Sequence, residues 1–354
     1  MNLPSIDILR AHSTHRLSTL PILILMPHSA CNCKCIMCDI WRSNARKEEI
    51  PAEVLARHLA DLRKLRVRWV VLSGGEALLH GNLWELCTLL KSIPVRITLL
   101  STGLLLGKYA NEISRWCDEV IVSLDGSEKV HDRIRQIPGA FAKLADGISE
   151  LLCVNPGFKV TGRCVIQSQN YIDMPKCVDA AREIGLSQVS FLPVDVSTAG
   201  FGRNNVMKKG TVEVPLALTR PEVEHFGQIV DFIIERRKDD FDRGFIAESP
   251  EKLRRMVHYF RALNQDAGFP VPNCNAPWVS AVVEADGQVR PCFFHEPFGN
   301  IKEENLLSIV NSKKATIFRR QLDVHSDPTC ERCTCSLYLK STKQLAKAAP
   351  TQTA

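Results

Sequence analysis

Short apolar runs recur along the first part of the chain, and each is followed by a stretch with apolar residues at helical spacing. Pro51, for example, opens a stretch in which Leu55, Leu59 and Leu62 share one helical face. The apolar runs, which predict buried strands, cover residues 20–26, 67–72, 95–100, 119–124, 158–166 and 188–194. Repeated strand–helix units predict a parallel sheet, either an open doubly wound sheet or an incomplete (β/α) barrel. In both folds ligands bind at the carboxyl ends of the strands.

The pattern changes after the sixth run. Helical spacing beyond Pro221 and again over residues 250–264 predicts a helical connector. Two further β-rich runs flank Asp286 and Gly287, a pair typical of a tight hairpin turn, so a small second domain is expected. The polar end of the chain is expected to be poorly ordered. The predicted units are an N-terminal extension (1–19), a barrel (20–200), a connector (201–272), a small C-terminal domain (273–340) and a disordered tail (341–354).

Composition narrows the class of function. Of the 354 residues, 45% are hydrophobic and 24% charged, which are ordinary globular values. A net charge of only +6 and an aromatic content of 6% do not indicate a nucleic-acid surface. The chain has no apolar run long enough to span a membrane and no signal-peptide pattern at its start. We therefore expect a cytoplasmic protein that contacts neither nucleic acid nor membrane.

Nine of the 14 cysteines lie in two short zones, which indicates metal ligation rather than disulfides in a large chain without an export signal. In the first zone, Cys31, Cys35 and Cys38 follow the first predicted strand with the spacing C-x3-C-x2-C. Three thiolates are fewer than a structural zinc site takes, whereas a 4Fe–4S cluster with three thiolates leaves one iron open to a small molecule. A zinc site completed by Cys33 or His28 is the alternative.

The second zone contains Cys274, Cys292, Cys330, Cys333 and Cys335. The predicted hairpin brings Cys274 and Cys292 to one end, and a C-x2-C pair supplies two more ligands. This set suits a fully protein-ligated 4Fe–4S cluster or a zinc site, and spacing does not separate the two.

A specific resemblance lies in residues 31–41, CNCKCIMCDIW, which are similar to the signature of the radical S-adenosylmethionine (SAM) enzymes. The resemblance implies a 4Fe–4S cluster on Cys31, Cys35 and Cys38, whose open iron binds SAM. The segment departs from the family pattern at Met37, where an aromatic residue is usual. The segment Ser-Gly-Gly-Glu at 73–76 resembles the family's Gly-Gly-Glu motif, which binds the methionyl ammonium of SAM. Glycines allow close backbone approach and a carboxylate complements a cation, so Gly74, Gly75 and Glu76 are candidate SAM ligands.

Two more motifs follow successive predicted strands. Ser101 and Thr102 lie where the family has a polar segment near the ribose or adenine, although Thr102 replaces the usual Asn. Ser123 and Asp125 belong to a segment resembling the family's Ser-x-Asp-Gly, and Arg135 lies where an arginine often meets the SAM carboxylate. Because the motifs end four successive strands and face one rim, we predict a partial (β/α)6 TIM-like barrel over residues 20–200.

The second cysteine zone resembles the SPASM and twitch auxiliary-cluster domains. The resemblance implies one auxiliary 4Fe–4S cluster on Cys274, Cys292, Cys330 and Cys333. Cys335 is then left over, either as a substitute ligand, as a thiol that delivers a hydrogen atom to a substrate radical, or as an ordinary loop cysteine.

The resemblance implies that an electron donor such as flavodoxin or ferredoxin reduces the SAM-bound cluster. SAM is then cleaved to a 5′-deoxyadenosyl radical, which abstracts a hydrogen atom from substrate. We expect a two-electron oxidation of a small molecule of sugar or aminocyclitol type, because the segment before Cys31 leaves no room for the peptide-recognition domain common in peptide maturases. The alternatives are a peptide-modifying maturase, a radical epimerase, and a non-catalytic zinc-binding module.

Overall fold

A computed structural model of the protein describes residues 6–198, 200 and 216–340. Within these residues the strands form one nine-stranded sheet in the order β6-β5-β4-β3-β2-β1-β7-β8-β9. The first six strands are parallel and coincide with the predicted apolar runs. They are β1 (Ile22–Leu25), β2 (Trp69–Leu72), β3 (Arg96–Ser101), β4 (Glu119–Ser123), β5 (Val160–Ile166) and β6 (Gln188–Pro193).

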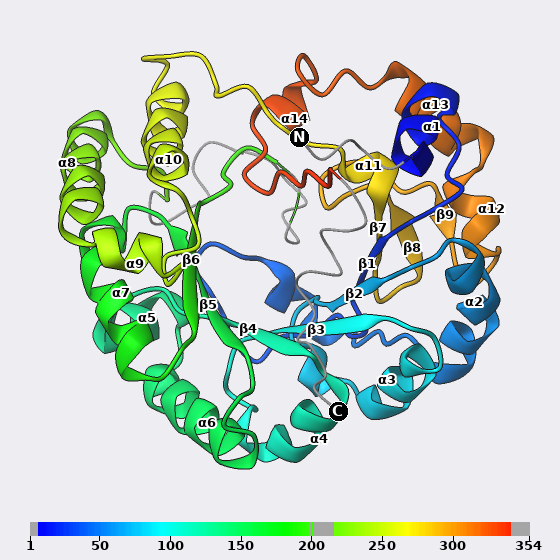
Figure 1. The fold of residues 1–354 in the computed structure, drawn as a ribbon, viewed down its shortest axis with the longest axis horizontal. Helices are drawn as coiled ribbons and strands as arrows, with labels where there is room; N and C mark the ends of the chain where they lie inside the picture. Colours follow the sequence, from blue (N-terminus) through cyan, green and yellow to red (C-terminus); the bar gives the residue numbers. More distant parts are fainter. Residues whose placement is uncertain (1–5, 199, 201–215, 341–354) are drawn as a thin grey trace.

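The strand order decides between the two predicted architectures. A doubly wound sheet reverses its order at a switch point, whereas each of these six strands lies beside the preceding one. The strands curve around the centre of the molecule with the helices outside them, so the predicted partial barrel is confirmed (Figure 1). The outer helices are α2 (Ala52–Lys64), α3 (Leu83–Lys91), α4 (Ala110–Trp116), α5 (Glu128–Arg135), α6 (Ala140–Val154) and α7 (Met174–Glu183).

Local sequence explains where these elements begin and end. Pro51 precedes α2, whose Val54, Leu55 and Leu62 are buried against the sheet, and Arg66 ends the turn after the helix with a φ of 52°. Short 3-10 helices lie in the loops that follow strands. They are η1 (Ile40–Ala45), η2 (Ala77–Leu79), η3 (Gly107–Tyr109) and η4 (Tyr171–Asp173).

Polar side chains close the amino end of the barrel. The indole Nε1 of Trp69 donates to Thr98 Oγ1 at 2.8 Å, and that hydroxyl donates to Glu119 Oε1 at 2.9 Å. Arg96 and Lys159 both form ion pairs with the same carboxylate. These polar side chains contact one another and fill this end, so a ligand is expected at the carboxyl end of the barrel.

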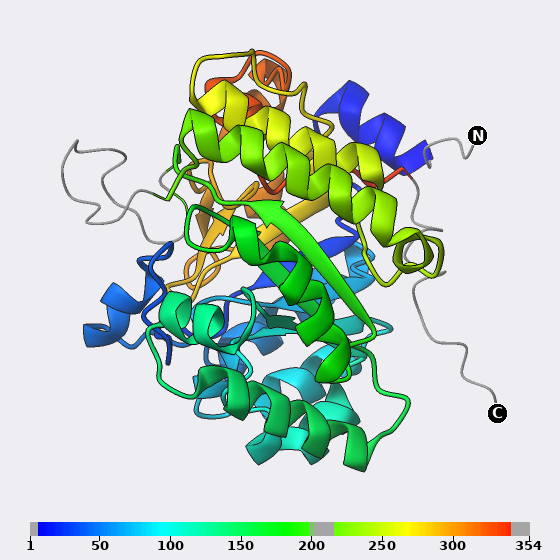
Figure 2. The same ribbon diagram turned by 90° about the vertical axis from the view of Figure 1, so that its left-hand side faces the viewer.

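The predicted connector contains α8 (Arg220–Arg236), α9 (Lys238–Asp242) and α10 (Pro250–Leu263). Helices α8 and α10 pack side by side (Figure 2). The hydroxyl of Tyr259 on α10 donates to the carbonyl of Val194 after β6. Helix α1 (Ile6–Thr14) lies in the N-terminal extension. The start of the connector and the predicted disordered tail fall outside the described residues. No helix in the described ranges combines the length and the apolar composition that crossing a bilayer requires.

The C-terminal region continues the barrel sheet. The predicted hairpin forms between β7 (Ser280–Val283) and β8 (Gln288–Arg290), with Gly287 in its turn at a φ of +92°. Strand β7 also pairs in parallel with β1, a contact that the sequence did not indicate. The auxiliary cysteines are thus positioned relative to the barrel by backbone hydrogen bonds. The remaining elements are α11 (Ala276–Val279), β9 (Gly299–Asn300), α12 (Leu306–Val310), α13 (Lys313–Gln321) and α14 (Pro328–Glu331).

Candidate functional site

The three spaced cysteines lie on the loop between β1 and η1, which neighbouring elements hold on two sides. The backbone N–H of Cys31 donates to Asn44 Oδ1 at 2.9 Å, and Asn44 Nδ2 returns a bond to the Cys31 carbonyl at 3.0 Å. On the other side, Lys34 N–H donates to the carbonyl of Arg135 at the end of α5. Cys35 is buried, whereas Cys31 and Cys38 are partly exposed. Three thiols are therefore presented on one anchored loop at the carboxyl end of the barrel.

The loop after β2 packs directly on the cysteine loop because of its two glycines. Gly74 has a φ of +112°, which favours glycine, and a Cβ on Gly75 would lie 2.1 Å from the carbonyl oxygen of Ala30. The N–H of Glu76 donates to that carbonyl at 2.9 Å. The close approach predicted for these glycines is thus made to the backbone beside Cys31.

Glu76 joins the loops that follow β2 and β3. Its side chain is fully buried, and Oε2 accepts hydrogen bonds from Ser101 Oγ at 3.0 Å and from the N–H and Oγ1 of Thr102, both at 2.7 Å. Burial raises the pKa of Glu76, and these hydrogen bonds oppose the rise. Thr102 Oγ1 also lies 2.9 Å from Asn32 Oδ1 on the cysteine loop. The structure therefore brings three predicted motifs together; their contacts with SAM stay a prediction.

Asp125 and Arg135 form a buried ion pair that reaches the cysteine loop. Arg135 Nη2 lies 2.6 Å from Asp125 Oδ2, and Nη1 donates to Cys35 Sγ at 3.3 Å. The Asp125 N–H donates to Nδ1 of buried His131. A hydrogen bond from Cys33 and the charge of Arg135 lower the pKa of Cys35, although burial opposes the shift. The contact between Arg135 and Cys35 was not foreseen, because the two residues are 100 positions apart and belong to different motifs.

This first site fits a 4Fe–4S cluster. Its donors are soft thiols, the ligands that iron–sulfur clusters use. The buried guanidinium of Arg135 also donates a hydrogen bond to Cys35 Sγ, which favours the thiolate form of this ligand. Ser123, the last residue of β4, is partly exposed at the same rim and is available to a ligand there.

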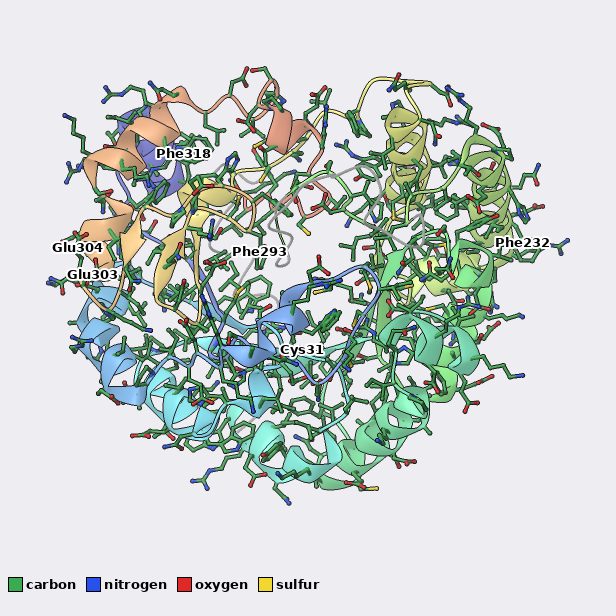
Figure 3. All side chains as sticks on the ribbon, turned by 180° about the vertical axis from the view of Figure 1, so that it is seen from behind. Cys31, Phe232, Phe293, Glu303, Glu304 and Phe318 are labelled. Atoms are coloured by element: carbon green, nitrogen blue, oxygen red, sulfur yellow. The ribbon has the colours of Figure 1, made fainter. Side chains whose placement is uncertain are left out.

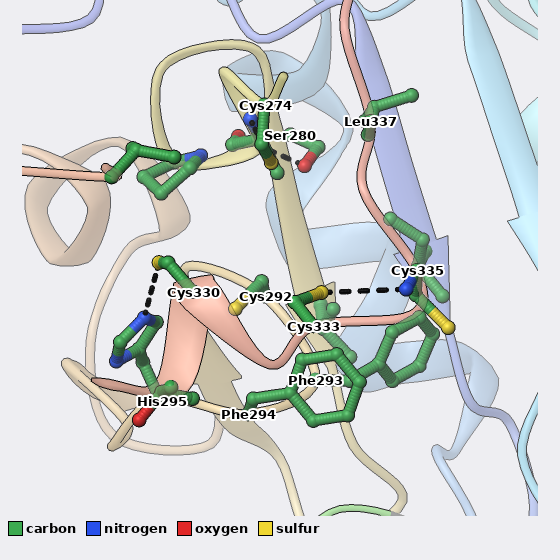
Figure 4. A pocket seen from close by; sticks show the side chains of 16 residues that line it. Cys274, Ser280, Cys292, Phe293, Phe294, His295, Cys330, Cys333, Cys335 and Leu337 are labelled. Carbon is green, nitrogen blue, oxygen red and sulfur yellow. Dashed lines mark hydrogen bonds between the residues drawn. The ribbon is translucent and has the colours of Figure 1, made fainter. Parts of the chain in front are cut away.

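The five C-terminal cysteines line one pocket together with Ile24 of β1 (Figure 4). Hydrogen-bond donors accompany the sulfurs: Ala276 N–H lies 3.5 Å from Cys274 Sγ, and Cys335 N–H lies 3.3 Å from Cys333 Sγ. Burial raises the pKa of Cys292 to about 11, although hydrogen bonds from the backbone N–H groups of Phe294 and His295 oppose the rise. The pocket therefore holds enough thiols for a fully protein-ligated cluster, and metal binding would deprotonate them.

His295, which is more often a packing residue at such a loop position, lies in direct contact with one of these cysteines. Its Nε2 is 3.4 Å from Cys330 Sγ and 3.8 Å from Asp327 Oδ1. Asp327 caps α14 by accepting from the N–H groups of Thr329 and Cys330 at 2.9 Å. An Asp-Pro pair before the C-x2-C motif is the sequence signal for this cap; no sequence signal places His295 beside it.

Cys335 lines the same pocket, but its sulfur points away from Cys330 (Figure 4). Its backbone N–H donates to Cys333 Sγ. A role as ligand or hydrogen-atom donor stays a prediction for this thiol.

The two cysteine sites flank the same barrel. Figure 3 places Cys31 and Phe293 near the centre of the molecule, whereas Phe232 and Phe318 lie at its periphery. Strand β1 contributes Ile24 to the auxiliary pocket and leads directly into the loop of Cys31. One strand therefore connects the two sites.

Comparisons with known proteins agree with this geometry. The Radical SAM superfamily profile matches residues 25–181, and the SPASM iron–sulfur cluster-binding domain matches residues 274–334. The Fe-coproporphyrin III synthase of Methanosarcina barkeri is 26% identical over 88% of this chain and 80% of its own length. The subtilosin biosynthesis protein AlbA of Bacillus subtilis is 25% identical over 80% of this chain, but only 57% of AlbA is covered. The pre-heme d1 synthase of Dinoroseobacter shibae is 27% identical over 52% of this chain and 46% of its own length.

Solved structures show the same fold. Streptococcus suis SuiB bound to S-adenosylmethionine superposes with a TM-score of 0.64 over 97% of this chain and 78% of SuiB, at 14% identity. The enzyme anSMEcpe with bound AdoMet gives 0.63 over 88% of this chain and 86% of its own, at 20% identity. The two profile matches, and not these superpositions, show that the chain belongs to the radical SAM superfamily with a C-terminal SPASM region, and is an enzyme that uses a SAM-bound 4Fe–4S cluster and auxiliary iron–sulfur ligation.

Proposed function

We propose that the protein oxidises a small-molecule substrate by two electrons, using SAM at the first cluster and an auxiliary cluster as electron acceptor. When bound, the first cluster and SAM supply reductive cleavage and hydrogen-atom abstraction. The protein's own groups hold the cofactors, position the substrate and exclude water.

The proposed ligands are Cys31, Cys35 and Cys38 for the first cluster and Cys274, Cys292, Cys330 and Cys333 for one auxiliary cluster. Arg135 orients the first set through its hydrogen bond to Cys35, and Asp125 fixes the guanidinium. Gly75 and Glu76 hold the cysteine loop against the loop after β2. Ser101, Thr102 and Ser123 lie at the same rim and are proposed to meet SAM, as are Gly74 and Glu76.

One observation supports the oxidative reaction: strand β1 contributes to the auxiliary pocket and leads into the loop of the first cysteines. Ile24 lines the auxiliary pocket, and the parallel pairing of β1 with β7 fixes that pocket to the barrel wall. A substrate in the barrel is thus held between the two metal sites, an arrangement that supports electron transfer from substrate to the auxiliary cluster. Flavodoxin or ferredoxin as the electron donor to the first cluster stays a prediction, as does the cytoplasmic location.

The substrate class is argued from the relatives. The Fe-coproporphyrin III synthase, named for a small molecule, aligns over 80% of its length, compared with 57% for AlbA, named for bacteriocin biosynthesis. This alignment supports a small molecule over a peptide. A sugar or aminocyclitol, expected from the sequence, stays a prediction.

The experiment is anaerobic reconstitution with iron and sulfide, followed by reduction with dithionite in the presence of SAM. Fe-coproporphyrin III, an aminocyclitol and a short peptide are then supplied in turn, each with and without deuterium at carbon. Deuterium in 5′-deoxyadenosine and an oxidised small-molecule product support the proposal. Solvent deuterium in an unoxidised product would assign epimerisation and contradict it, as would turnover of the peptide alone. A Cys31→Ala variant controls for adventitious iron.

A further inference from the structure

Among the residues that the structure describes, the inner side of the barrel and its rim carry arginines that differ in their partners. Arg96 pairs with Glu119, and Arg135 pairs with Asp125, so both charges are balanced by buried carboxylates. Arg163, in the middle of β5, is exposed and has no carboxylate within ion-pair distance among the residues that the structure describes. Its side-chain contact is Nε to Ser190 Oγ at 3.4 Å.

The side chain of Arg163 faces the barrel interior. On β5 the neighbouring residue, Cys164, is buried, and its thiol forms a hydrogen bond with the thiol of Cys177 on α7. Cys164 therefore points outward to the helix layer. Successive side chains on a strand alternate between the two faces of a sheet. Arg163 therefore points inward, away from the helices, and its exposure is to the space that the barrel encloses.

Hydroxyl groups flank this guanidinium on both neighbouring strands. The pairing register places Ser123 of β4 and Ser190 of β6 directly beside Arg163. Ser123 is partly exposed at the end of its strand, and Asp125, two residues further, accepts from the N–H of Val165 on β5. The row of Ser123, Arg163 and Ser190 thus lies one step below the Asp125–Arg135 pair that contacts Cys35.

We propose that Arg163, with Ser190 beside it, binds an anionic group of the substrate, a carboxylate or a phosphate. The planar guanidinium fork matches either oxyanion in a bidentate geometry, and hydroxyls complete such sites. The position next to the cysteine loop would hold the substrate beside the site of hydrogen abstraction. This inference rests on the proposed function, because it assigns a feature of the substrate that the barrel receives.

The test uses the reconstituted protein with both clusters and SAM, under anaerobic conditions. The probes are coproporphyrin III, which carries carboxylates, its neutral tetramethyl ester, and GTP, which carries phosphates. Their dissociation constants are measured by calorimetry for the wild type, Arg163→Gln and Arg163→Lys. Arg57→Gln is the matched control, because Arg57 is an exposed arginine on α2, outside the barrel.

At least one anionic probe is expected to bind the wild type, and the ester is expected to bind more weakly than coproporphyrin III if carboxylates are the ligands. Arg163→Gln should raise the dissociation constant of the bound anion about tenfold or more, Arg163→Lys should raise it less, and Arg57→Gln should leave it unchanged. Preference for coproporphyrin III or GTP separates carboxylate from phosphate.

Failure of every anionic probe to bind the wild type would overturn the subsite, as would equal binding to Arg163→Gln. The dissociation constant of SAM is measured in parallel. If Arg163→Gln weakened the binding of SAM alone, Arg163 would be assigned to the cofactor and the substrate subsite would be overturned. Formation of 5′-deoxyadenosine by the wild type reports on the proposed function separately. An enzyme that binds the anion through Arg163 but leaves SAM intact would contradict the proposed function and not the subsite.

Discussion

A methyl group at Gly75 should displace the loop that carries the first cysteines. The Cβ of Gly75→Ala would lie 2.1 Å from the Ala30 carbonyl oxygen and 2.5 Å from its carbon, whereas ordinary contact begins at 3.4 Å. Both are backbone atoms, so no rotamer change relieves the overlap. The φ of Gly75 is outside the range that favours glycine, so the effect is steric. The backbone next to Cys31 must therefore retreat by more than an ångström.

The expected loss of folding stability in Gly75→Ala follows from that overlap. Overpacking of this kind destabilises by about 1–3 kcal/mol, and loss of the Glu76 to Ala30 hydrogen bond adds about 1 kcal/mol. In a chain of 354 residues we expect the melting temperature to fall by roughly 3–5 °C. Displacement of Cys31 should also prevent loading of the first cluster. Iron content would then fall from about eight atoms per chain to about four.

The assay is iron and acid-labile sulfide per chain after anaerobic reconstitution, together with a thermal melt followed by circular dichroism. Gly81→Ala is the control, because its Cβ would lie 3.5 Å from Glu49 Oε2, an ordinary contact in the loop that continues from the same motif. If Gly75→Ala loaded iron and melted like Gly81→Ala, the inferred packing of the two loops would be refuted.

Three further predictions concern groups near the two sites. Arg135→Gln leaves Asp125 buried and unpaired and should cost about 3–5 kcal/mol in urea unfolding, and adding Asp125→Asn should recover part of that loss. Burial lowers the pKa of His131 to about 3 from its ordinary 6.5, so the folded state keeps the imidazole neutral while the unfolded state takes up a proton below pH 6.5. The free energy of unfolding should therefore fall by about 2 kcal/mol between pH 6.5 and 5. A His131→Phe variant should flatten that slope in urea titrations, and an unchanged slope would refute the assignment. His295→Leu removes a donor to Cys330 and should lower the midpoint potential of the auxiliary cluster, whereas His295→Gln should keep it closer to wild type in an electron paramagnetic resonance titration.

Much of the barrel could be predicted from the sequence because its strands are short, apolar and separated by helices. The spacing of Cys31, Cys35 and Cys38, and of the motifs that end the next strands, placed the chemistry at one rim. Strand order was beyond reach, because periodicity reports which residues form a strand and not which strands become neighbours. Family resemblance, rather than the pattern itself, selected the barrel before the structure did.

Contacts between residues far apart in sequence could not be predicted. The pairing of β1 with β7 joins residues about 260 positions apart and decides that the auxiliary pocket shares a wall with the barrel. The hydrogen bond from Arg135 to Cys35 and the contact of His295 with Cys330 depend on loop geometry. Gly75, which the sequence predicts beside SAM, closely approaches Ala30 of the protein itself, and its contact with SAM stays a prediction. Arg163 belongs to none of the sequence motifs, and only the inward direction of its side chain on β5 indicates a role.

The most direct test of the account is the electron paramagnetic resonance spectrum of the reduced, reconstituted protein before and after addition of SAM. If the loop of Cys31, Cys35 and Cys38 holds a cluster with one iron open to SAM, the spectrum should change on addition and 5′-deoxyadenosine should form. Both effects should be absent in Cys31→Ala. A wild-type spectrum that SAM leaves unchanged, with the nucleotide intact, would contradict the central claim.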